Sequence, residues 1–382
     1  MVNHHHSLTL SLILFGWIIM KKIIFLTHNK KKNSDGVWKK IRSQVNAFVN
    51  IGYDVDFFYL DEGGLIWENV NNNVIRKYAL KFRYGFYLAV RKLIAKEEAY
   101  DFAYIRKPHG GFFSLCLPFL LSSLKKERTI IMMEIPTYPY DLEIRTFKEK
   151  VSNYAFLCTL PFFKNNLDKV LYMGDLVDNI WGLPCQRIGN GIDVNAIKKV
   201  PTKKTGNCFV FVGVGHLAFW HGFDRLILGM KEYKGDREII FKIVGGGEPE
   251  LNRLKTLAHD LKNNKVIFEG VLSGECLYSV LESADVCVDS LGRHRSGNNC
   301  NNSLKSKEYC ARGLPFIKSH IDYSFGAEEF IYQVNADESA IDINSIIAWR
   351  ESLSDDFSSK ERCYAERNLT WETQFLELLG DK

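Results

Sequence analysis

From Lys22 onward, short apolar runs rich in β-branched and aromatic residues alternate with longer amphipathic stretches. Strands that alternate with helical stretches are typical of βαβ units, so the pattern predicts parallel sheets. The expected strands are residues 23–27, 55–60, 102–105, 129–133 and 170–173 in the first half, and 208–214, 239–244, 266–268, 286–289 and 315–318 in the second. The predicted fold class is α/β, with two Rossmann-like parallel-sheet domains that face each other across a cleft.

A helix is expected at residues 37–50, where Val37, Ile41, Val45 and Phe48 recur at helical spacing. The join between the halves is expected within residues 184–201, where proline, glycine and polar residues cluster. The expected units are a first domain at 20–188, a second domain at 189–365, and a C-terminal helix at 366–382 that packs back on the first domain.

Residues 1–19 differ from the rest of the chain, because 8–20 form a mostly apolar run preceded by three histidines. The run is too short for a transmembrane helix, which takes about 20 residues. It also lacks the basic start and the cleavage site of a signal peptide. We expect an extension outside the fold, with a short membrane-surface anchor as the alternative.

Composition narrows the function classes. The chain has 382 residues, 46% hydrophobic and 25% charged, which is ordinary for a globular protein of two domains. A net charge of +5 is too modest for a whole-protein nucleic-acid surface. The nine cysteines show no metal-binding spacing and favour buried thiols in a reducing cytoplasm.

The most informative segment runs from Ser303 to Pro315. A short helix that begins after Ser303 and ends at Gly313 places Lys305 and Glu308 three residues apart, on one face. A carboxylate there accepts two hydrogen bonds from a ribose diol, while the cation faces phosphate. The alternative is a solvated charged face on a connecting helix.

Three glycine-rich turns precede this segment, each at the end of an expected strand. Glycine lets the backbone approach a diphosphate, and a helix N-terminus offers free N–H groups. Histidines beside the first turn are candidates for donating a hydrogen bond to a phosphate oxygen or, alternatively, structural residues. The candidates are Gly215, His216 and His221 at the first turn, Gly245 and Gly246 at the second, and Leu272 after the third, where main-chain groups are expected to contact a base.

In order and spacing, these turns resemble the group 1 (family 4) retaining glycosyltransferases of GT-B fold, of the bacterial surface-polysaccharide type. The resemblance is carried by residues 213–221, 245–247, 270–272, 284–286 and 304–315, and more loosely by Gly36 and residues 134–141. It implies that the first half binds an acceptor. It implies that the second half binds a UDP-sugar or GDP-sugar, without another cofactor or a metal.

The resemblance also implies residue roles. Glu308 matches the carboxylate that holds the donor ribose, in a donor-binding helix that also contains Ser303, Leu304 and Lys305. His216 and His221 stand where the family often has arginine and lysine. The earlier glutamate of the family falls on Cys300, so that half of its paired-glutamate motif is absent. Nearby Arg293, as a catalytic candidate, and Arg295, as a donor ligand, are expected to supply charge.

Other chemistry falls in the first half. Glu134 and His109, each on a loop after an expected strand, are candidates for acceptor contact or proton handling, with a structural role as the alternative for Glu134. The acidic pair Asp54 and Asp56 begins a strand and is expected to be structural. Residues 76–96 contain seven cations, no acidic residue and several aromatics, which suits either an anionic membrane face or an amphipathic helix with a core face.

The sequence therefore predicts a metal-independent retaining hexosyltransferase of cell-surface polysaccharide synthesis. Its expected acceptor is a glycan or a lipid-linked glycan, and its expected place is the cytoplasm or the cytoplasmic face of the inner membrane. Two alternatives remain open. One is a nucleotide-sugar 2-epimerase, and the other is a non-catalytic GT-B partner protein, an alternative that the cysteine at position 300 keeps open.

Overall fold

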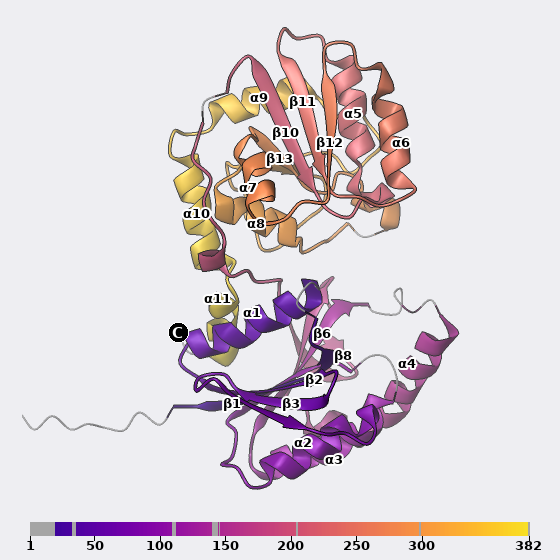
Figure 1. Ribbon diagram of the computed structural model, residues 1–382, viewed down its shortest axis with the longest axis vertical. Coiled ribbons are helices and arrows are strands. Elements are labelled where there is room, and N and C mark those ends of the chain that lie inside the picture. Colours follow the sequence, from indigo (N-terminus) through magenta and orange to yellow (C-terminus); the bar gives the residue numbers. More distant parts are fainter. Residues whose placement is uncertain are drawn as a thin grey trace, which may run out of the picture.

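The computed structural model describes residues 20–32, 36–108, 112–139, 144, 146–203, 205–297 and 299–380. Two α/β halves lie one above the other in Figure 1, the first in indigo to magenta and the second in pink to yellow. Each half has a sheet with helices on both faces. The predicted α/β class with two parallel-sheet domains is confirmed.

Within the described residues the first sheet has nine strands in the order β4-β3-β2-β1-β5-β6-β7-β9-β8. Its parallel core contains all five strands predicted for this half. The strands are β1 (Lys22–Lys30), β2 (Asp54–Asp61), β3 (Gly64–Asn69), β4 (Val74–Tyr78), β5 (Phe102–Arg106), β6 (Ile130–Tyr138), β7 (Lys169–Gly174), β8 (Asn179–Ile180) and β9 (Leu183–Arg187).

Helices cover both faces of this sheet. On one face α1 buries Trp38, Ile41, Val45 and Phe48, so the predicted helix is confirmed with a start one residue earlier. The helices are α1 (Gly36–Asn50), α2 (Phe86–Ile94), α3 (Leu117–Lys126) and α4 (Phe147–Thr159), with short 3₁₀ turns η1 (Arg83–Gly85), η2 (Phe113–Cys116), η4 (Leu160–Phe162) and η5 (Lys164–Asn166).

The region at residues 76–96 is not one amphipathic helix. Its first residues form β4, which pairs antiparallel with β3, and β3 pairs antiparallel with β2. The hairpin turns at Gly64, whose φ of +127° favours glycine, and a Cβ there would lie 2.4 Å from a carbonyl oxygen. Of the aromatics, Phe86 and Tyr87 are buried core, whereas Phe82 is largely exposed.

The second sheet is parallel throughout its described strands, in the order β12-β11-β10-β13-β14-β15. All five strands predicted here are present. The strands are β10 (Cys208–Val214), β11 (Glu238–Val244), β12 (Lys265–Gly270), β13 (Val286–Val288), β14 (Phe316–Lys318) and β15 (Ile331–Gln333).

The helices of the second half enclose this sheet, and the last two return toward the first half (Figure 1). The α-helices are α5 (Phe223–Glu232), α6 (Glu250–Leu257), α7 (Gly274–Glu282), α8 (Leu304–Arg312), α9 (Ile343–Ser352), α10 (Phe357–Asn368) and α11 (Trp371–Leu379). The 3₁₀ turns are η6 (Val194–Ala196), η7 (Phe219–His221), η8 (Ala258–Asp260) and η9 (Arg293–Ser296).

The chain crosses between the halves twice, and the two crossings touch. The backbone N–H of Ile192 donates to the carbonyl of Leu369 at 2.9 Å. Beyond this contact, α11 packs on α1 of the first half, where the rings of Phe375 and Phe48 stack with centroids 4.0 Å apart. The C-terminal helix thus adds its apolar face to the core of the first half.

Two acidic groups have structural surroundings. Asp56 is buried and accepts hydrogen bonds from Trp67 Nε1 at 2.9 Å and from the Tyr100 hydroxyl at 2.7 Å. Its neighbour Asp54 accepts from Asn69 Nδ2 at 3.0 Å. None of the described helices is both long enough and apolar enough to cross a bilayer.

Glu361 on α10 is fully buried, and neither carboxylate oxygen has a hydrogen-bond partner among the described residues. Burial raises the pKa of this carboxyl well above its usual value, opposed by Arg350 and Lys199. Since the unfolded chain loses this proton at lower pH than the folded chain does, the carboxyl destabilises the fold increasingly as pH rises above the usual glutamate range.

We therefore expect Glu361→Met to stabilise the protein by about 1–3 kcal/mol at neutral pH, because an unsatisfied polar group is removed. The gain should shrink at about pH 3, below the usual pKa of a glutamate, where the wild-type carboxyl carries its proton in both states. Urea unfolding at the two pH values measures both effects. Glu366→Met, on the exposed side of the same helix, is the control, and a gain independent of pH would contradict the explanation.

Candidate functional site

Three glycine turns meet at the carboxyl edge of the second sheet. Gly215 follows β10, Gly245 follows β11, and Gly270 ends β12. The N–H of Gly245 donates to the carbonyl of Gly270 at 2.6 Å, and a Cβ on Gly245 would lie 1.8 Å from the carbonyl oxygen of Gly215. The backbones of the turns touch, so position 245 requires glycine and no side chain covers this edge there.

His221 ends η7 directly beside the first turn. Its Nδ1 lies 3.1 Å from the backbone nitrogen of Ala218 and 3.2 Å from the carbonyl oxygen of the same residue, so Ala218 holds the ring in place. A Cβ on Gly215 would lie 3.2 Å from this Nε2, so the ring faces the turn. Burial, followed by the charge of Lys305, lowers the pKa of His221 to about 3. The imidazole is therefore neutral at the site.

Lys305, in the first turn of α8, points to the same place. Its Nζ lies 2.9 Å from Asp289 Oδ1, at the end of β13, and 3.4 Å from Ser290 Oγ. Burial alone raises the pKa of Asp289, but Lys305, His320 and the hydroxyls of Ser303 and Ser306 lower it well below the usual value. An ionised Asp289 holds the lysine in place.

The N-terminus of α8 adds free backbone donors to this cluster. Ser303 is the N-cap residue, but its hydroxyl bonds Asp289 and no side chain caps the helix. The first N–H groups of α8 therefore have no side-chain acceptor, and a helix N-terminus carries partial positive charge. Together with the glycine turns and Lys305, they form a surface that suits an anion.

Two arginines of η9 differ in their surroundings. The charge of Arg293 lowers the pKa of His221, and burial lowers the pKa of Arg293 itself, opposed by Asp289. No hydrogen bond or ion pair joins its guanidinium to a described residue. Arg295 is fully engaged, with bonds to both carboxylate oxygens of Asp224 at 2.9 and 3.0 Å and to Glu338. Arg293 is thus available to a ligand, whereas Arg295 holds η9 against α5.

We expect Arg293→Gln to weaken nucleotide-diphosphate binding at least tenfold, since a hydrogen bond to a charged group contributes about 1.5–3 kcal/mol. Its unfolding free energy should stay within about 0.5 kcal/mol of wild type. Arg295→Gln is the matched comparison, and there we expect lower stability and a smaller change in affinity. Isothermal titration and urea unfolding measure the two quantities, and the reverse pattern would exchange the two roles.

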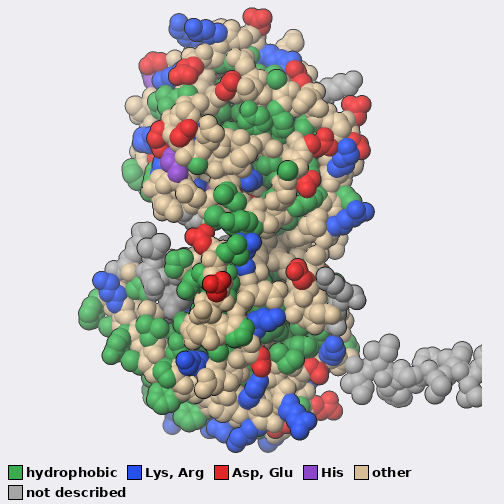
Figure 2. All heavy atoms as spheres, turned by 180° about the vertical axis from the view of Figure 1, so that it is seen from behind, with side chains coloured by type: hydrophobic (Ala, Val, Ile, Leu, Met, Phe, Trp, Pro, Cys, Tyr) green, Lys and Arg blue, Asp and Glu red, His purple; other side chains and the backbone are tan. Residues whose placement is uncertain are grey.

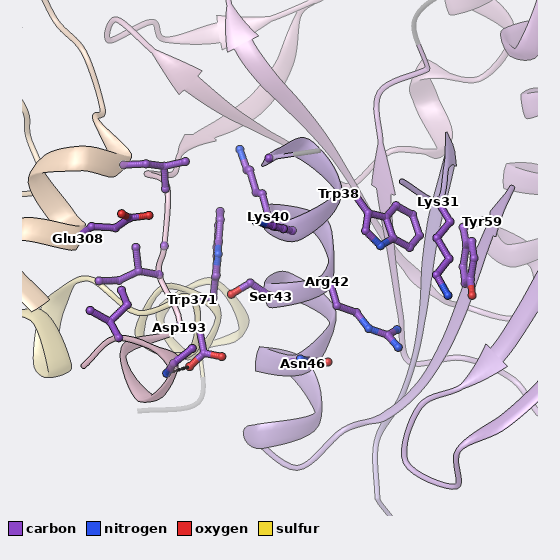
Figure 3. A pocket seen from close by; sticks show the side chains of 17 residues that line it. Lys31, Trp38, Lys40, Arg42, Ser43, Asn46, Tyr59, Asp193, Glu308 and Trp371 are labelled. Carbon is purple, nitrogen blue, oxygen red and sulfur yellow. Dashed lines mark hydrogen bonds between the residues drawn. The ribbon is translucent and has the colours of Figure 1, made fainter. Parts of the chain in front are cut away.

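Glu308 lies on α8 and faces the first half across a cavity of about 610 Å³ (Figure 3). Its side chain is open to this cavity, and no hydrogen bond or ion pair joins it to a described residue. The surrounding atoms of both halves raise the pKa of its carboxyl, opposed by Arg312 and Lys39. An unpartnered carboxylate at the cavity is the arrangement expected for holding hydroxyl groups.

The opposite wall of the cavity is basic and aromatic. Figure 3 shows Lys40 and Ser43 on the side of α1 toward Trp371 and Glu308, whereas Arg42 points away from them. Arg42 pairs with Glu68 at 2.5 Å, and its buried Nη1 has no partner among the described residues. The remaining lining side chains include Lys31, Lys39, Trp38, Asn46, Tyr59 and Asp193.

Glu134 lies beneath this wall, not in it. It is fully buried and accepts from Gln44 Nε2 and the Tyr104 hydroxyl, each at 2.9 Å, and from Arg106 at 3.1 Å, while Lys40 Nζ lies 3.5 Å away. Burial lowers the pKa of Lys40 to about 8, opposed by Glu134. These contacts are those of a residue that positions α1. They do not support the prediction that Glu134 contacts substrate.

The other predicted site residues divide by position. Gly36 and Leu304 line the cavity of Glu308. His216 is exposed, and its ring lies against Gly247. Gly246 and Leu272 lie at the second and third turns, where Leu272 is partly buried against the core. His109 lies outside the described residues.

Cys300 stands where the family has a glutamate and provides no carboxylate to the site. Its Sγ lies 3.5 Å from the Tyr323 hydroxyl, and it bridges to Ile321. Sequence reasoning missed Asp289 and Ser290, which position Lys305, and also Arg42 and Lys39 on the facing wall. Asp289 is the last residue of a predicted strand. That position placed it at the carboxyl edge of the sheet and could have identified it as a site residue.

Similar folds occur among solved glycosyltransferases. A glycosyltransferase from Rickettsia africae matches with a TM-score of 0.60 and 12% identity, over 95% of this chain and 98% of that one. HepE from Anabaena, in complex with UDP, matches with a TM-score of 0.58 and 11% identity, over 95% of this chain and 100% of that one. The lipopolysaccharide outer core galactosyltransferase WaaB matches with a TM-score of 0.53 and 13% identity, over 94% and 100%. The two parallel-sheet halves therefore have the GT-B fold, as predicted.

In sequence, 180 residues are 26% identical to an uncharacterized glycosyltransferase of Methanocaldococcus jannaschii. The match covers 47% of this chain and 44% of that protein, less than half of either. No family model matches the chain.

Proposed function

We propose that this protein is a glycosyltransferase that uses a nucleotide-sugar donor. The observation that carries the proposal is the convergence of Gly215, His221, Arg293 and Lys305 with the open N-terminus of α8 at the carboxyl edge of the second sheet. This cluster offers cations and N–H donors to a diphosphate. We propose that Glu308, one turn further along α8, holds the ribose.

The solved relatives support a uridine nucleotide as the first candidate. HepE has been solved with UDP and with UDP-glucose, at 11% and 14% identity to this chain. We propose a UDP-hexose donor for this chain, with GDP-sugars as the alternative. Because Lys305 and Arg293 supply positive charge where a diphosphate would lie, we propose that transfer needs no metal.

The proposed reaction retains the configuration of the sugar. The bond from the sugar to the diphosphate breaks while the acceptor attacks from the same face, and stabilising the departing diphosphate lowers the barrier. Arg293, Lys305, His221 and the N–H groups of α8 are the groups for that task. The acceptor would approach from the wall formed by α1, whose cations Lys39 and Arg42 suit a glycan or a lipid-linked glycan with negative charge. Synthesis of a surface polysaccharide at the cytoplasmic face of a membrane is the corresponding role.

A thermal-shift panel with UDP, GDP, ADP and CMP tests the donor site. A nucleotide at one hundred times its dissociation constant stabilises the folded state by roughly 2.7 kcal/mol. We expect the largest shift with UDP and no change on addition of EDTA. No shift with any of the four nucleotides would overturn the proposed donor site. Turnover of a UDP-sugar without an acceptor, to its 2-epimer, would identify an epimerase instead.

A further inference from the structure

Exposed apolar side chains gather on one flank of the first half, formed by η1, η2, α3, α4 and η4. Figure 2 shows hydrophobic side chains on the lower left of the molecule, the side on which α4 lies in this view, with cations along the bottom. We name this surface the apolar flank. Its members are Phe82, Tyr84, Phe112, Leu115, Phe119, Phe147, Val151, Tyr154, Leu157 and Phe162.

The helix α4 presents an apolar stripe to the outside. Phe147 is 83% exposed and Tyr154 is 70% exposed, with Val151 between them at helical spacing. The inward face already packs on the domain through Phe156. Apolar residues on the outward face therefore add nothing to the core of this half, and an exposed patch of this kind marks an interaction site.

Beside α4, the flank is hollowed into a groove of about 480 Å³. Leu115, Phe119 and Phe162 supply its apolar surface. Arg91 and Lys126 are its charged residues, and no carboxylate is among the described residues that line it. An apolar groove bordered by cations has the chemistry of a site for a hydrocarbon chain with an anionic head group.

Cations also border the rest of the flank. Lys148 and Lys150 are exposed on α4 beside the apolar stripe, with Glu149 between them, and Lys164 follows in η5. The charge of the described residues beside the stripe is thus net positive. This arrangement favours a negatively charged lipid surface, since aromatic side chains enter the interface while lysine and arginine remain at the head groups.

The position of the flank relative to the cleft fits this partner. η2 follows the carboxyl end of β5, and α4 follows the carboxyl end of β6, so the flank begins at the sheet edge that faces the second half. We propose that the apolar flank docks the protein on an anionic membrane surface, with the cleft opening beside it. Docking itself does not require a nucleotide-sugar donor. Only the idea that docking brings the cleft to a lipid-linked acceptor rests on the proposed function.

Vesicle co-sedimentation of the full chain tests the proposal. We expect binding to vesicles of equal parts phosphatidylcholine and phosphatidylglycerol, weak binding to phosphatidylcholine alone, and loss of binding at high salt. Lys148→Glu/Lys150→Glu should weaken binding at least about fivefold, because each cation near an anionic membrane surface strengthens binding by about that factor. Lys231→Glu/Lys234→Glu, with the same change of charge on the second half, should bind as wild type does.

A second pair of variants separates docking from charge alone. Phe119→Ser/Phe162→Ser should lose binding at unchanged net charge, whereas Val74→Ser/Ile75→Ser, on exposed positions of β4, should keep it. Unchanged melting temperatures and unchanged nucleotide shifts show that these variants are folded and that the donor site is intact.

Binding by the Phe119/Phe162 variant equal to wild type, or no binding by wild type, would overturn the proposal. So would concentration-dependent self-association that this variant abolishes, which would make the flank a protein interface. A nucleotide shift that persists when vesicle binding is absent would leave the donor site standing alone, so the two failures are distinguishable.

Discussion

Replacing Glu308 with alanine is expected to abolish the thermal stabilisation that the preferred nucleotide gives. Its carboxylate has no partner among the described residues and faces the cavity between the halves. Two hydrogen bonds from a ribose diol to a carboxylate contribute about 1.5–3 kcal/mol each, so their loss weakens binding more than a hundredfold. At a concentration that saturates wild type, the variant should gain less than about 0.4 kcal/mol.

The unfolding free energy of Glu308→Ala without nucleotide should stay close to that of wild type, because no internal bond is broken. Glu282→Ala, an exposed position at the end of α7, is the matched control and should keep the full nucleotide shift. A shift that survives in Glu308→Ala would remove this residue from the ribose role. The other donor-site residues would then need a new orientation of the nucleotide.

Replacing Glu134 is expected to reduce the stability of the fold. Replacement by alanine should destabilise the protein by about 3–5 kcal/mol, because it leaves the buried charges of Arg106 and Lys40 without their carboxylate. Urea unfolding at neutral pH measures this, and the exposed Glu62→Ala should stay within about 0.5 kcal/mol of wild type. A stable Glu134→Ala variant with no transfer activity would instead restore its predicted role at the substrate.

The stabilisation that Glu134 provides should depend on pH. Burial raises its pKa, but Arg106, Lys40 and two hydrogen bonds lower it, and the result is below the usual glutamate value. The folded state therefore favours the ionised form, and this stabilisation is present above the usual glutamate pKa and lost as pH falls through the lowered value. The stability difference between wild type and Glu134→Gln should shrink correspondingly in acid.

The parallel core of both sheets could be predicted from the sequence, because buried strands read as apolar runs with helices between them. The hairpin of β3 and β4 could not be recognised in that way. Arg76 and Lys77 on β4 are exposed, so an edge strand carries no apolar run, and Gly64 was the remaining signal. The outward stripe of α4 escaped notice for a related reason, since its apolar residues mix with the lysines of a polar helix.

Within the candidate site, glycine turns and the position of Glu308 on α8 followed from local spacing. The contrast between Arg293 and Arg295 did not, because it depends on Asp224 and Glu338, which lie far away in sequence. The burial of Glu134 depends in the same way on partners from α1 and β5. Spacing along the chain identifies which charges are near the site, but only packing decides which of them a ligand can reach.

The paired crossings between the halves have a consequence for the cavity at Glu308. Ile192 and the Leu369–Thr370 segment are hydrogen bonded side by side, and α11 beyond them is anchored on α1. A Cβ on Gly191 would lie 2.6 Å from the indole of Trp371, so the two segments are in close contact. The two crossing segments are thus joined to each other as well as to the halves that they connect. Gly191, Ile192 and Trp371 of these segments also line the cavity at Glu308, so the join between the halves is itself part of the cavity wall.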